Sequence, residues 1–117
     1  MSTSKTYDFV IEESVRFDKR ITWKDSTGTP IDLTGYTAQM MIKKRITDTS
    51  PVIELNTTNS RITLGGAAGT IDLLISSADT DGLDLDVGVY DLEMIEPGGE
   101  RVRLLEGKVT LSPAVTT

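Results

Sequence analysis

The stretch "DVGVYDLEMIEPGGERVRLLEGKVTLS", residues 86–112, decides the fold class of this chain. Apolar and polar residues alternate on both sides of its central segment "EPGGE", and Tyr90, Leu92 and Met94 share one face. Strict alternation is typical of a strand with one buried and one solvated face. A segment rich in glycine and proline between two such runs predicts a hairpin loop. The stretch therefore predicts two antiparallel strands over a hydrophobic core.

The alternation changes register within the second of these runs. Val102 and Leu104 face inward at its start, whereas Val109 is in register with Leu105. Gly107 stands near the change, and a glycine inside a strand often marks a bulge or a strand that passes between two sheets. We therefore expect the irregularity at Gly107.

The same period of two recurs along the chain, in runs separated by segments rich in Gly, Pro, Asn and Ser. The further runs cover residues 7–11, 15–23, 36–45, 52–55, 61–64 and 69–76. Residues 76–84 are compatible with at most one helical turn. Short strands at regular turn spacings predict an all-β fold, an immunoglobulin-like antiparallel β-sandwich of about seven to eight strands, with residues 1–117 as a single domain. The inward positions predict a core that includes Phe9, Ile11, Phe17, Trp23, Leu33, Met40, Ile42, Ile71, Leu73, Leu104 and Val109.

The composition excludes several kinds of site and partner. The 117 residues include no Cys and no His, which excludes disulfides, thiolate metal sites and triads built on histidine. The net charge is −6, whereas nucleic-acid binding draws much of its affinity from basic groups. The basic cluster "KKR" at residues 43–45 has no interleaved aromatic residues, so we interpret it as the wet edge of a strand. We predict no nucleic-acid partner.

Membrane and catalytic functions are also disfavoured. The chain lacks an apolar run of about 18 residues, and its start lacks the basic and apolar regions of a signal peptide. Glu12 and Glu13 are adjacent, so on a strand they point to opposite faces and cannot act as a carboxylate pair. The glycines of "GGAAG" at residues 65–69 lack the lysine of a phosphate-binding loop, and Trp23 reads as a core residue. We predict no membrane partner, no cofactor and no enzymatic activity.

The acidic segment "DTDGLDLD", which begins at Asp79, raises the question of a calcium site. An EF-hand alignment would place Ser77 at its first position and Gly88 at its twelfth, where a bidentate glutamate is required. We therefore predict no metal site, with a looser calcium site at a sandwich edge as the alternative. In the structural interpretation Asp79 caps one short helical turn, and Asp81 and Asp84 are solvated.

The segment "DVGVYDL" has the spacing of the corner that precedes a late strand in immunoglobulin-like sandwiches. In this interpretation Asp86 ties down the corner backbone and Gly88 allows a close approach of two chain segments. Tyr90 is buried, with its hydroxyl bonded to main chain a few residues upstream, and Leu92 fills the core. These four residues form the predicted structural corner.

Three stretches resemble a family of small virion-associated proteins of tailed bacteriophages. They are "GTPIDLTGYTA" at 28–38, "GVYDLEMIEPGGE" at 88–100 and "RLLEGKVTLSPAVT" at 103–116. The resemblance runs from about Tyr7 to Thr116 and is similar in layout to the amino-terminal sandwich module of upper baseplate proteins. The sequence departs from the family pattern at Ser14, where a glycine is expected.

The resemblance implies a structural protein that acts through contacts with other virion proteins, present in multiple copies in the particle. The expected role is a tail or baseplate adaptor or a fibre-attachment module, with assembly in the cytoplasm of the bacterial host. A capsid decoration protein is the first alternative and a carbohydrate-binding module, which would need exposed aromatic residues, is the second. We expect residues 1–6 and 112–117 to form extended arms, and Lys24, Lys43 and Lys44 to guard one sheet edge.

Overall fold

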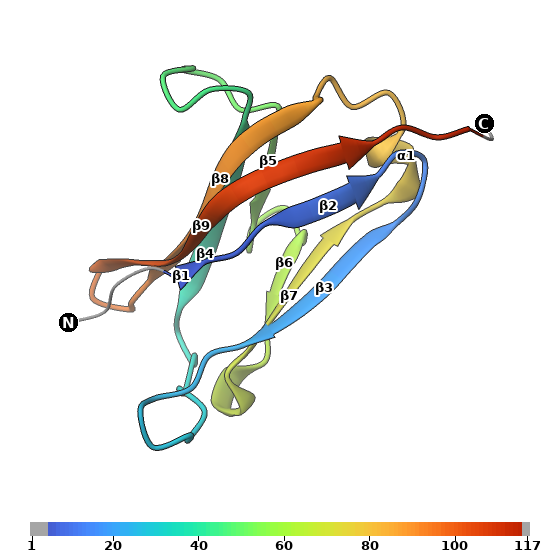
Figure 1. The fold of residues 1–117 in the computed structure, drawn as a ribbon. Helices are drawn as coiled ribbons and strands as arrows, with labels where there is room; N and C mark the ends of the chain where they lie inside the picture. The colour runs from blue at the N-terminus through green and yellow to red at the C-terminus, as the bar shows by residue number, and fades with distance from the viewer. Residues whose placement is uncertain (1–4, 116–117) are drawn as a thin grey trace.

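A computed structural model describes residues 5–115, which form two β-sheets packed face to face (Figure 1). The chain begins with β1 (Lys5–Thr6), β2 (Phe9–Glu12), β3 (Phe17–Thr22), β4 (Thr37–Lys43), β5 (Ile53–Asn56) and β6 (Ile62–Leu64). It continues through the 3-10 turn η1 (Gly66–Ala68), β7 (Thr70–Ile75), α1 (Ser77–Thr80), β8 (Val87–Ile95) and β9 (Arg101–Ser112). None of the helices in the described part is long and apolar enough to cross a membrane.

The strand order is that of an immunoglobulin-like sandwich, which confirms the predicted fold class. The large sheet has the order β1-β9-β8-β4-β5, with β2 also on β9, and the small sheet has the order β3-β7-β6. These orders correspond to G-F-C-C′ and B-E-D of immunoglobulin-like domains. The described residues contain nine strands, one more than the eight predicted runs. The additional strand is the two-residue β1, which lies within the predicted amino-terminal arm.

The prediction of a wholly antiparallel arrangement is wrong at one edge of the large sheet. Both β1 and β2 run parallel to β9, with Phe9 opposite Val109 and Glu12 opposite Ser112. After β2 the chain turns and enters β3 in the other sheet (Figure 1). Alternation along a strand reports which face is buried and carries no information about the direction of its neighbour, so the sequence could not reveal this pairing.

The core lies between the two sheets and draws side chains from both. Eight of the predicted core residues are buried: Phe9, Ile11, Leu33, Met40, Ile42, Ile71, Leu73 and Val109. Phe17, Trp23 and Leu104 are only partly buried and pack against the core from its border. Phe17 belongs to the edge strand β3, Trp23 follows the end of that strand, and Leu104 sits in a bulge.

The predicted irregularity at Gly107 is misplaced by three residues. Leu92 pairs with Leu105 and Glu93 pairs with Arg103, so Leu104 is the extra residue of a β-bulge. Gly107 itself lies in regular pairing opposite Tyr90. The apolar pair Leu104–Leu105 is the sequence signal of the bulge, because two adjacent residues of a regular strand cannot both face the core.

The turn before β8 separates the four aspartates. Ser76 Oγ accepts a hydrogen bond from the Asp79 backbone N–H (3.2 Å), so Ser76 is the helix cap and the prediction for Asp79 is wrong. Asp79 lies in the first helical turn, where a carboxylate is favourable, and pairs with Arg61. Asp81 accepts a hydrogen bond from Ser14 Oγ (2.7 Å) and Asp84 pairs with Lys44 (2.8 Å).

The predicted guarding of one sheet edge by lysines is wrong. Lys43 ends β4, which has neighbours on both sides and so lies inside the large sheet. Lys44 follows the strand and is engaged with Asp84, and Lys24 forms an isolated bridge with Pro30. The basic run marks the end of an interior strand, which the period of two does not distinguish from an edge.

The predicted arms fall partly at residues 1–4 and 116–117, outside the described residues. Lys5 and Thr6 form β1 and Ser112 ends β9. The backbone N–H of Ala114 donates to Glu13 Oε1 (3.1 Å) in the turn after β2. The described parts of both predicted arms are therefore bonded to the sandwich, by strand pairing at β1 and by a main-chain hydrogen bond at Ala114. In the same turn Ser14 has a φ of 66°, a left-handed conformation that explains why a glycine was expected there.

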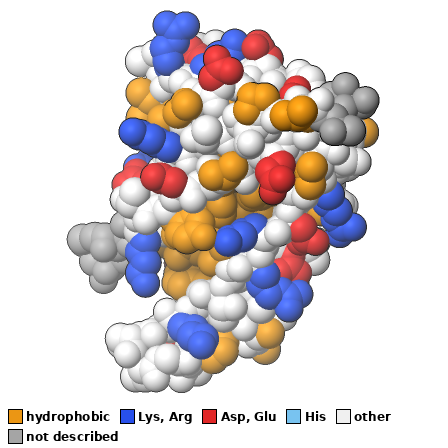
Figure 2. Space-filling model, turned by 45° about the vertical axis from the view of Figure 1, so that its right-hand side comes forward, with side chains coloured by type: hydrophobic (Ala, Val, Ile, Leu, Met, Phe, Trp, Pro, Cys, Tyr) orange, Lys and Arg blue, Asp and Glu red, His pale blue; other side chains and the backbone are white. Residues whose placement is uncertain are grey.

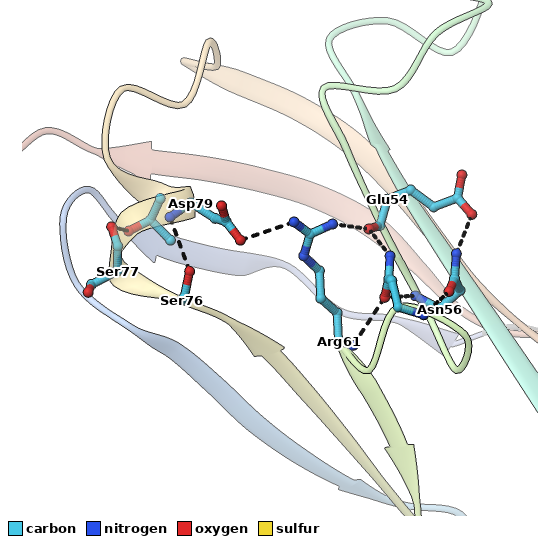
Figure 3. A network of polar contacts seen from close by, with 8 residues as sticks. Glu54, Asn56, Arg61, Ser76, Ser77 and Asp79 are labelled. Carbon is cyan, nitrogen blue, oxygen red and sulfur yellow. Dashed lines mark hydrogen bonds and ion pairs between the residues drawn. The ribbon is translucent and has the colours of Figure 1, made fainter.

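Arg61 closes the side of the sandwich formed by β5 and β6 (Figure 3). Its guanidinium donates to the Glu54 carbonyl oxygen of β5 (3.0 Å) and to Asp79 Oδ2 of α1 (3.0 Å). Asn59 Nδ2 donates to the same Glu54 carbonyl (3.0 Å), so side chains cover the β5 edge at this point. A single side chain thus joins the edge of the large sheet to the turn that leads into β8.

Replacing Arg61 with Ala should lower the free energy of unfolding by about 1–2 kcal/mol, because it removes a bridge of charged hydrogen bonds. Arg61→Lys, which keeps the charge but cannot reach both partners with a planar fork, should recover only part of the loss. Urea denaturation measures both variants. Equal stability of Arg61→Ala and the parent protein would show that the bridge does not hold the two elements together.

Candidate functional site

The outer face of the large sheet carries a shallow groove of about 660 Å³ over β4, β8 and β9. Residues that point away from the core form its floor, and the strand register sets them in rows. In one row Val89 lies between Lys43 and Lys108, and in the next Asp91 lies between Met41 and Glu106. The groove is therefore built by the solvated half of the alternating pattern.

Part of this floor is apolar, although it faces solvent. Met41 and Val89 line the groove, and Ile46, in the loop after β4, is 83% exposed at its border. An outward face is usually polar throughout. Exposed apolar side chains gathered in a concave surface are typical of a protein–protein contact.

The bulge at Leu104 arranges the charges of the groove. In a regular strand Arg103 and Glu106, three residues apart, would point to opposite faces. Because the bulge inserts a residue between them, both reach the groove: Arg103 Nε lies 3.3 Å from Asp91 Oδ2, and its Nη1 lies 3.7 Å from Glu106 Oε1. Beside them Arg101 Nη1 pairs with Glu93 Oε1 (3.1 Å).

Asp91 is the carboxyl of this cluster whose ionised form is disfavoured by its surroundings. Burial raises the pKa of its carboxyl above the ordinary value, and the negative charge of Glu93 adds to this effect. Arg103 and Lys43 act in the opposite direction without cancelling it. A carboxylate that has lost part of its hydration gains when a hydrogen-bond donor or a cation approaches it. Asp91 is such a group in the lining of the groove.

Asp91→Asn should therefore stabilise the fold at neutral pH. A carboxyl whose pKa is raised in the folded state binds its proton more tightly there than in the unfolded chain. The stability that the protonated Asp91 carboxyl contributes is thus lost as the pH rises from the pKa of the unfolded chain through that of the folded protein. The amide of Asp91→Asn does not ionise and avoids this loss. Denaturation at about pH 7 and about pH 3 should show the gain at the higher pH and a smaller difference at the lower one.

Asp72→Asn is the matched control with the opposite sign. Hydrogen bonds from Arg20, at 2.7 and 3.0 Å, lower the pKa of the Asp72 carboxyl. Its stabilisation is present above the unfolded pKa and is lost as the pH falls through the folded one. Asp72→Asn should therefore destabilise at neutral pH. The same sign for both variants would contradict the assignment of Asp91.

The predicted corner lies next to the groove, and its residues have separate roles. Leu92 is fully buried, and Asp86 is exposed, with its backbone carbonyl accepting from the Leu111 N–H (2.8 Å). This main-chain bond holds the backbone at Asp86, and no hydrogen bond of the Asp86 carboxylate is found within residues 5–115. A Cβ on Gly88 would lie 2.7 Å from Leu85 Cδ1 and closer still to the Lys43 carbonyl oxygen, which only glycine allows.

Tyr90 is buried as predicted, but its hydrogen-bond partner is different. The hydroxyl donates to the carbonyl oxygen of Tyr7 (2.5 Å), on the segment between β1 and β2. The predicted acceptor was a few residues upstream, whereas Tyr7 is 83 positions away in the sequence. The side chain therefore fastens the parallel amino-terminal strands to the sheet and does not stabilise a local corner.

Sequence reasoning missed the groove. The alternation that puts Tyr90, Leu92 and Met94 on the buried face implies only that Asp91 and Glu93 face solvent, and it does not single out Met41. An apolar residue at an outward position, such as Met41 between Met40 and Ile42, was the available signal. The grouping of charges around Asp91 depends on the bulge, which the pattern placed elsewhere.

Comparisons with known proteins support the fold alone. No protein-family model and no curated protein matches the chain. An endo-fucoidan hydrolase of glycoside hydrolase family 107 is similar over 96% of this chain and 13% of its own, with 9% identity and a TM-score of 0.53. The extracellular domain of the voltage-gated sodium channel beta4 subunit aligns over 98% of both chains, with 13% identity and a TM-score of 0.48.

Proposed function

We propose that this chain is a non-enzymatic structural protein of a tailed bacteriophage particle, and that it docks another virion protein in the groove over β4, β8 and β9. The resemblance of three stretches to small virion-associated proteins supports the setting. The observation that carries the docking role is the mixed floor of the groove, where the outward-facing, partly buried Met41 and Val89 lie beside the partly buried Asp91. Within the particle it acts as a tail or baseplate adaptor or as a fibre-attachment module.

The chemistry of the groove indicates the partner. An apolar side chain would cover Met41, Val89 and Ile46, and a lysine, arginine or backbone N–H would approach Asp91. A cavity of about 660 Å³ accommodates a few side chains of a projecting loop rather than a folded domain. Apolar anchors surrounded by charged groups are the usual anatomy of a protein interface.

The aromatic residues argue against the carbohydrate-binding alternative. Phe9 and Tyr90 are buried, Phe17, Trp23 and Tyr36 are partly buried, and Tyr7 is 45% exposed. Phe9 contacts Tyr7, Phe17 and Tyr90, and Trp23 packs on Tyr36, so these rings are engaged with one another. Sugar binding needs an open aromatic platform, which these residues do not form together.

The test is incorporation into particles by complementation of a phage that lacks the gene. Met41→Lys places a charge on the apolar floor and should reduce the occupancy of the protein in purified particles at least tenfold, with an unchanged melting temperature. Thr63→Lys, at an exposed position of β6 on the other sheet, is the matched control and should be incorporated normally.

Normal incorporation of Met41→Lys would refute the groove as the docking site, and absence of the parent protein from particles would refute the virion role. The copy number separates the two structural roles. A number close to that of the major capsid subunit indicates decoration, and a number that follows the tail symmetry indicates an adaptor.

A further inference from the structure

The strand β3 has a free edge. It pairs with β7 on one side, and no strand among residues 5–115 pairs with its other side. Immunoglobulin-like sandwiches of the A-B-E-D type place their first strand at this position, beside the strand that β3 represents. Here the first strands of the chain, β1 and β2, pair with β9 in the other sheet. The outer N–H and C=O groups of β3 are therefore open to another strand.

Hydrophobic side chains accompany this edge. Figure 2 looks onto the side of the molecule where β2 and β3 form the borders of the two sheets, and it shows hydrophobic side chains gathered in a hollow. Tyr7 is 45% exposed, and Phe17 and Ile21 of β3 are partly buried on the face that points toward the core. A strand added to β3 would cover these side chains and would also form hydrogen bonds with the unpaired N–H and C=O groups of the β3 edge.

Lys19 sets the charge of this hollow. It shares the inward face of β3 with Phe17 and Ile21 and is half-buried. Its Nζ lies 5.3 Å from the centre of the Tyr7 ring, and no carboxylate within residues 5–115 forms an ion pair with it. By contrast Arg20, on the outward face, is held by Asp72 of the neighbouring strand. Lys19 is therefore the charge that an incoming strand would have to match.

The same charges disfavour pairing of β3 with a second copy of itself. Suppose that two copies of β3 pair antiparallel about a two-fold axis. Residues directly opposite each other point to the same face, so the residue at the axis lies opposite the same residue of the other copy. In the two registers that overlap five of the six residues of β3 this residue is Lys19 or Arg20, and in one of the two registers that overlap three residues it is Asp18. Like charges directly opposite one another destabilise the pair. The run Asp18–Lys19–Arg20 thus protects the edge from symmetric association.

We infer that the β3 edge accepts an extended segment of a different protein, which adds to the small sheet as a fourth strand. The segment carries an acidic residue opposite Lys19 and apolar residues opposite Phe17 and Ile21. Main-chain hydrogen bonds supply part of the affinity in this mode, and the alternate side chains supply selectivity. This surface is separate from the groove over β4, β8 and β9, so either can fail without the other.

Two blocked peptides test the inference with the full chain. Thr-Val-Thr-Glu-Lys-Val, laid antiparallel to β3, puts its glutamate opposite Lys19 and its valines opposite Phe17 and Ile21. Thr-Val-Thr-Lys-Lys-Val is the control. At millimolar concentration the first peptide should shift the NMR signals of the β3 backbone amides saturably, and the control should bind about fivefold more weakly. Lys19→Glu should reverse this preference.

No saturable shift of β3 amides at that concentration would overturn the inference, as would shifts confined to β8 and β9. An unchanged preference in Lys19→Glu would also overturn it, provided that the variant melts as the parent does. Should Lys19→Glu fail to fold, Asp18→Thr combined with Arg20→Thr supplies an independent readout. Sedimentation should show the parent as a monomer and this variant, whose register centred on residue 20 no longer opposes like charges, as more strongly self-associating, and adding Lys19→Thr should increase self-association further. Equal association of all three proteins would contradict the protective role of the charged run.

Discussion

Gly107→Ala is expected to lower the free energy of unfolding by about 2–3 kcal/mol, the upper part of the usual range for inserting a methyl group into a filled site. A Cβ at this position would lie 2.8 Å from Asp8 Oδ1 and 2.9 Å from the Tyr7 carbonyl carbon, and closer still to the Tyr7 carbonyl oxygen. The obstructing atoms cannot move away freely. The Tyr7 N–H donates to the Glu106 carbonyl (2.9 Å), and Asp8 Oδ1 accepts from the Lys108 N–H (2.9 Å).

The substitution should therefore detach the amino-terminal strands before it disturbs the rest of the sandwich. Hydrogen exchange should accelerate first in β1 and β2, and urea denaturation should give the overall loss. Gly98→Ala is the matched control, since nothing lies within 4 Å of a Cβ there and its backbone is not left-handed. It should change stability by less than about 0.5 kcal/mol. If Gly107→Ala behaves like Gly98→Ala, the close approach of the two strands is wrong.

Tyr90→Phe is expected to cost about 1–3 kcal/mol, because it removes the donor from a partly buried hydrogen bond to the Tyr7 carbonyl. Tyr90 as a whole is 4% exposed, its ring contacts Phe9, and phenylalanine preserves that packing. The comparison with Tyr36→Phe isolates the hydroxyl. Tyr36 packs against Trp23 and its hydroxyl makes no hydrogen bond to residues 5–115, so its loss should cost less than about 0.5 kcal/mol.

Alkaline unfolding gives a second measure of the same hydrogen bond. Burial raises the pKa of the Tyr90 hydroxyl above its ordinary value, and the charge of Asp8 adds to this. The folded state therefore keeps the proton that the unfolded chain gives up, and stability falls as the pH rises above about 10. Tyr90→Phe should show a weaker decline over that range than the parent protein. Equal declines, or no loss of stability at neutral pH, would show that the hydroxyl is not paired with Tyr7.

The two substitutions act on one contact and should not be additive. Gly107→Ala pushes against the Tyr7 carbonyl, and Tyr90→Phe releases it. In the Tyr90→Phe background the segment between β1 and β2 is less firmly held, so the added methyl group should cost less. A double-mutant cycle measures this coupling, and strict additivity would place the two effects at independent sites.

The sequence by itself determined the elements of this protein. Alternation of apolar and polar residues, a property of neighbours along the chain, located the eight longer strands and most of the core, including Met40, Ile42 and Leu73. Turn residues located the connections, and the "EPGGE" segment is the hairpin loop between β8 and β9. These features are local, because a strand shows its buried face in its own period whatever lies beside it.

Only the tertiary structure decided which strands are neighbours and what gathers between them. The parallel pairing of β2 with β9 and the hydrogen bond from Tyr90 to Tyr7 join segments that are distant in the sequence. The free edge of β3 likewise depends on where distant strands pair. The groove is of the same kind, because a bulge at Leu104 turns Arg103 and Glu106 toward Asp91. A period of two states that a residue faces outward, but its neighbours on that face belong to other strands, and their register follows from packing of the whole sandwich.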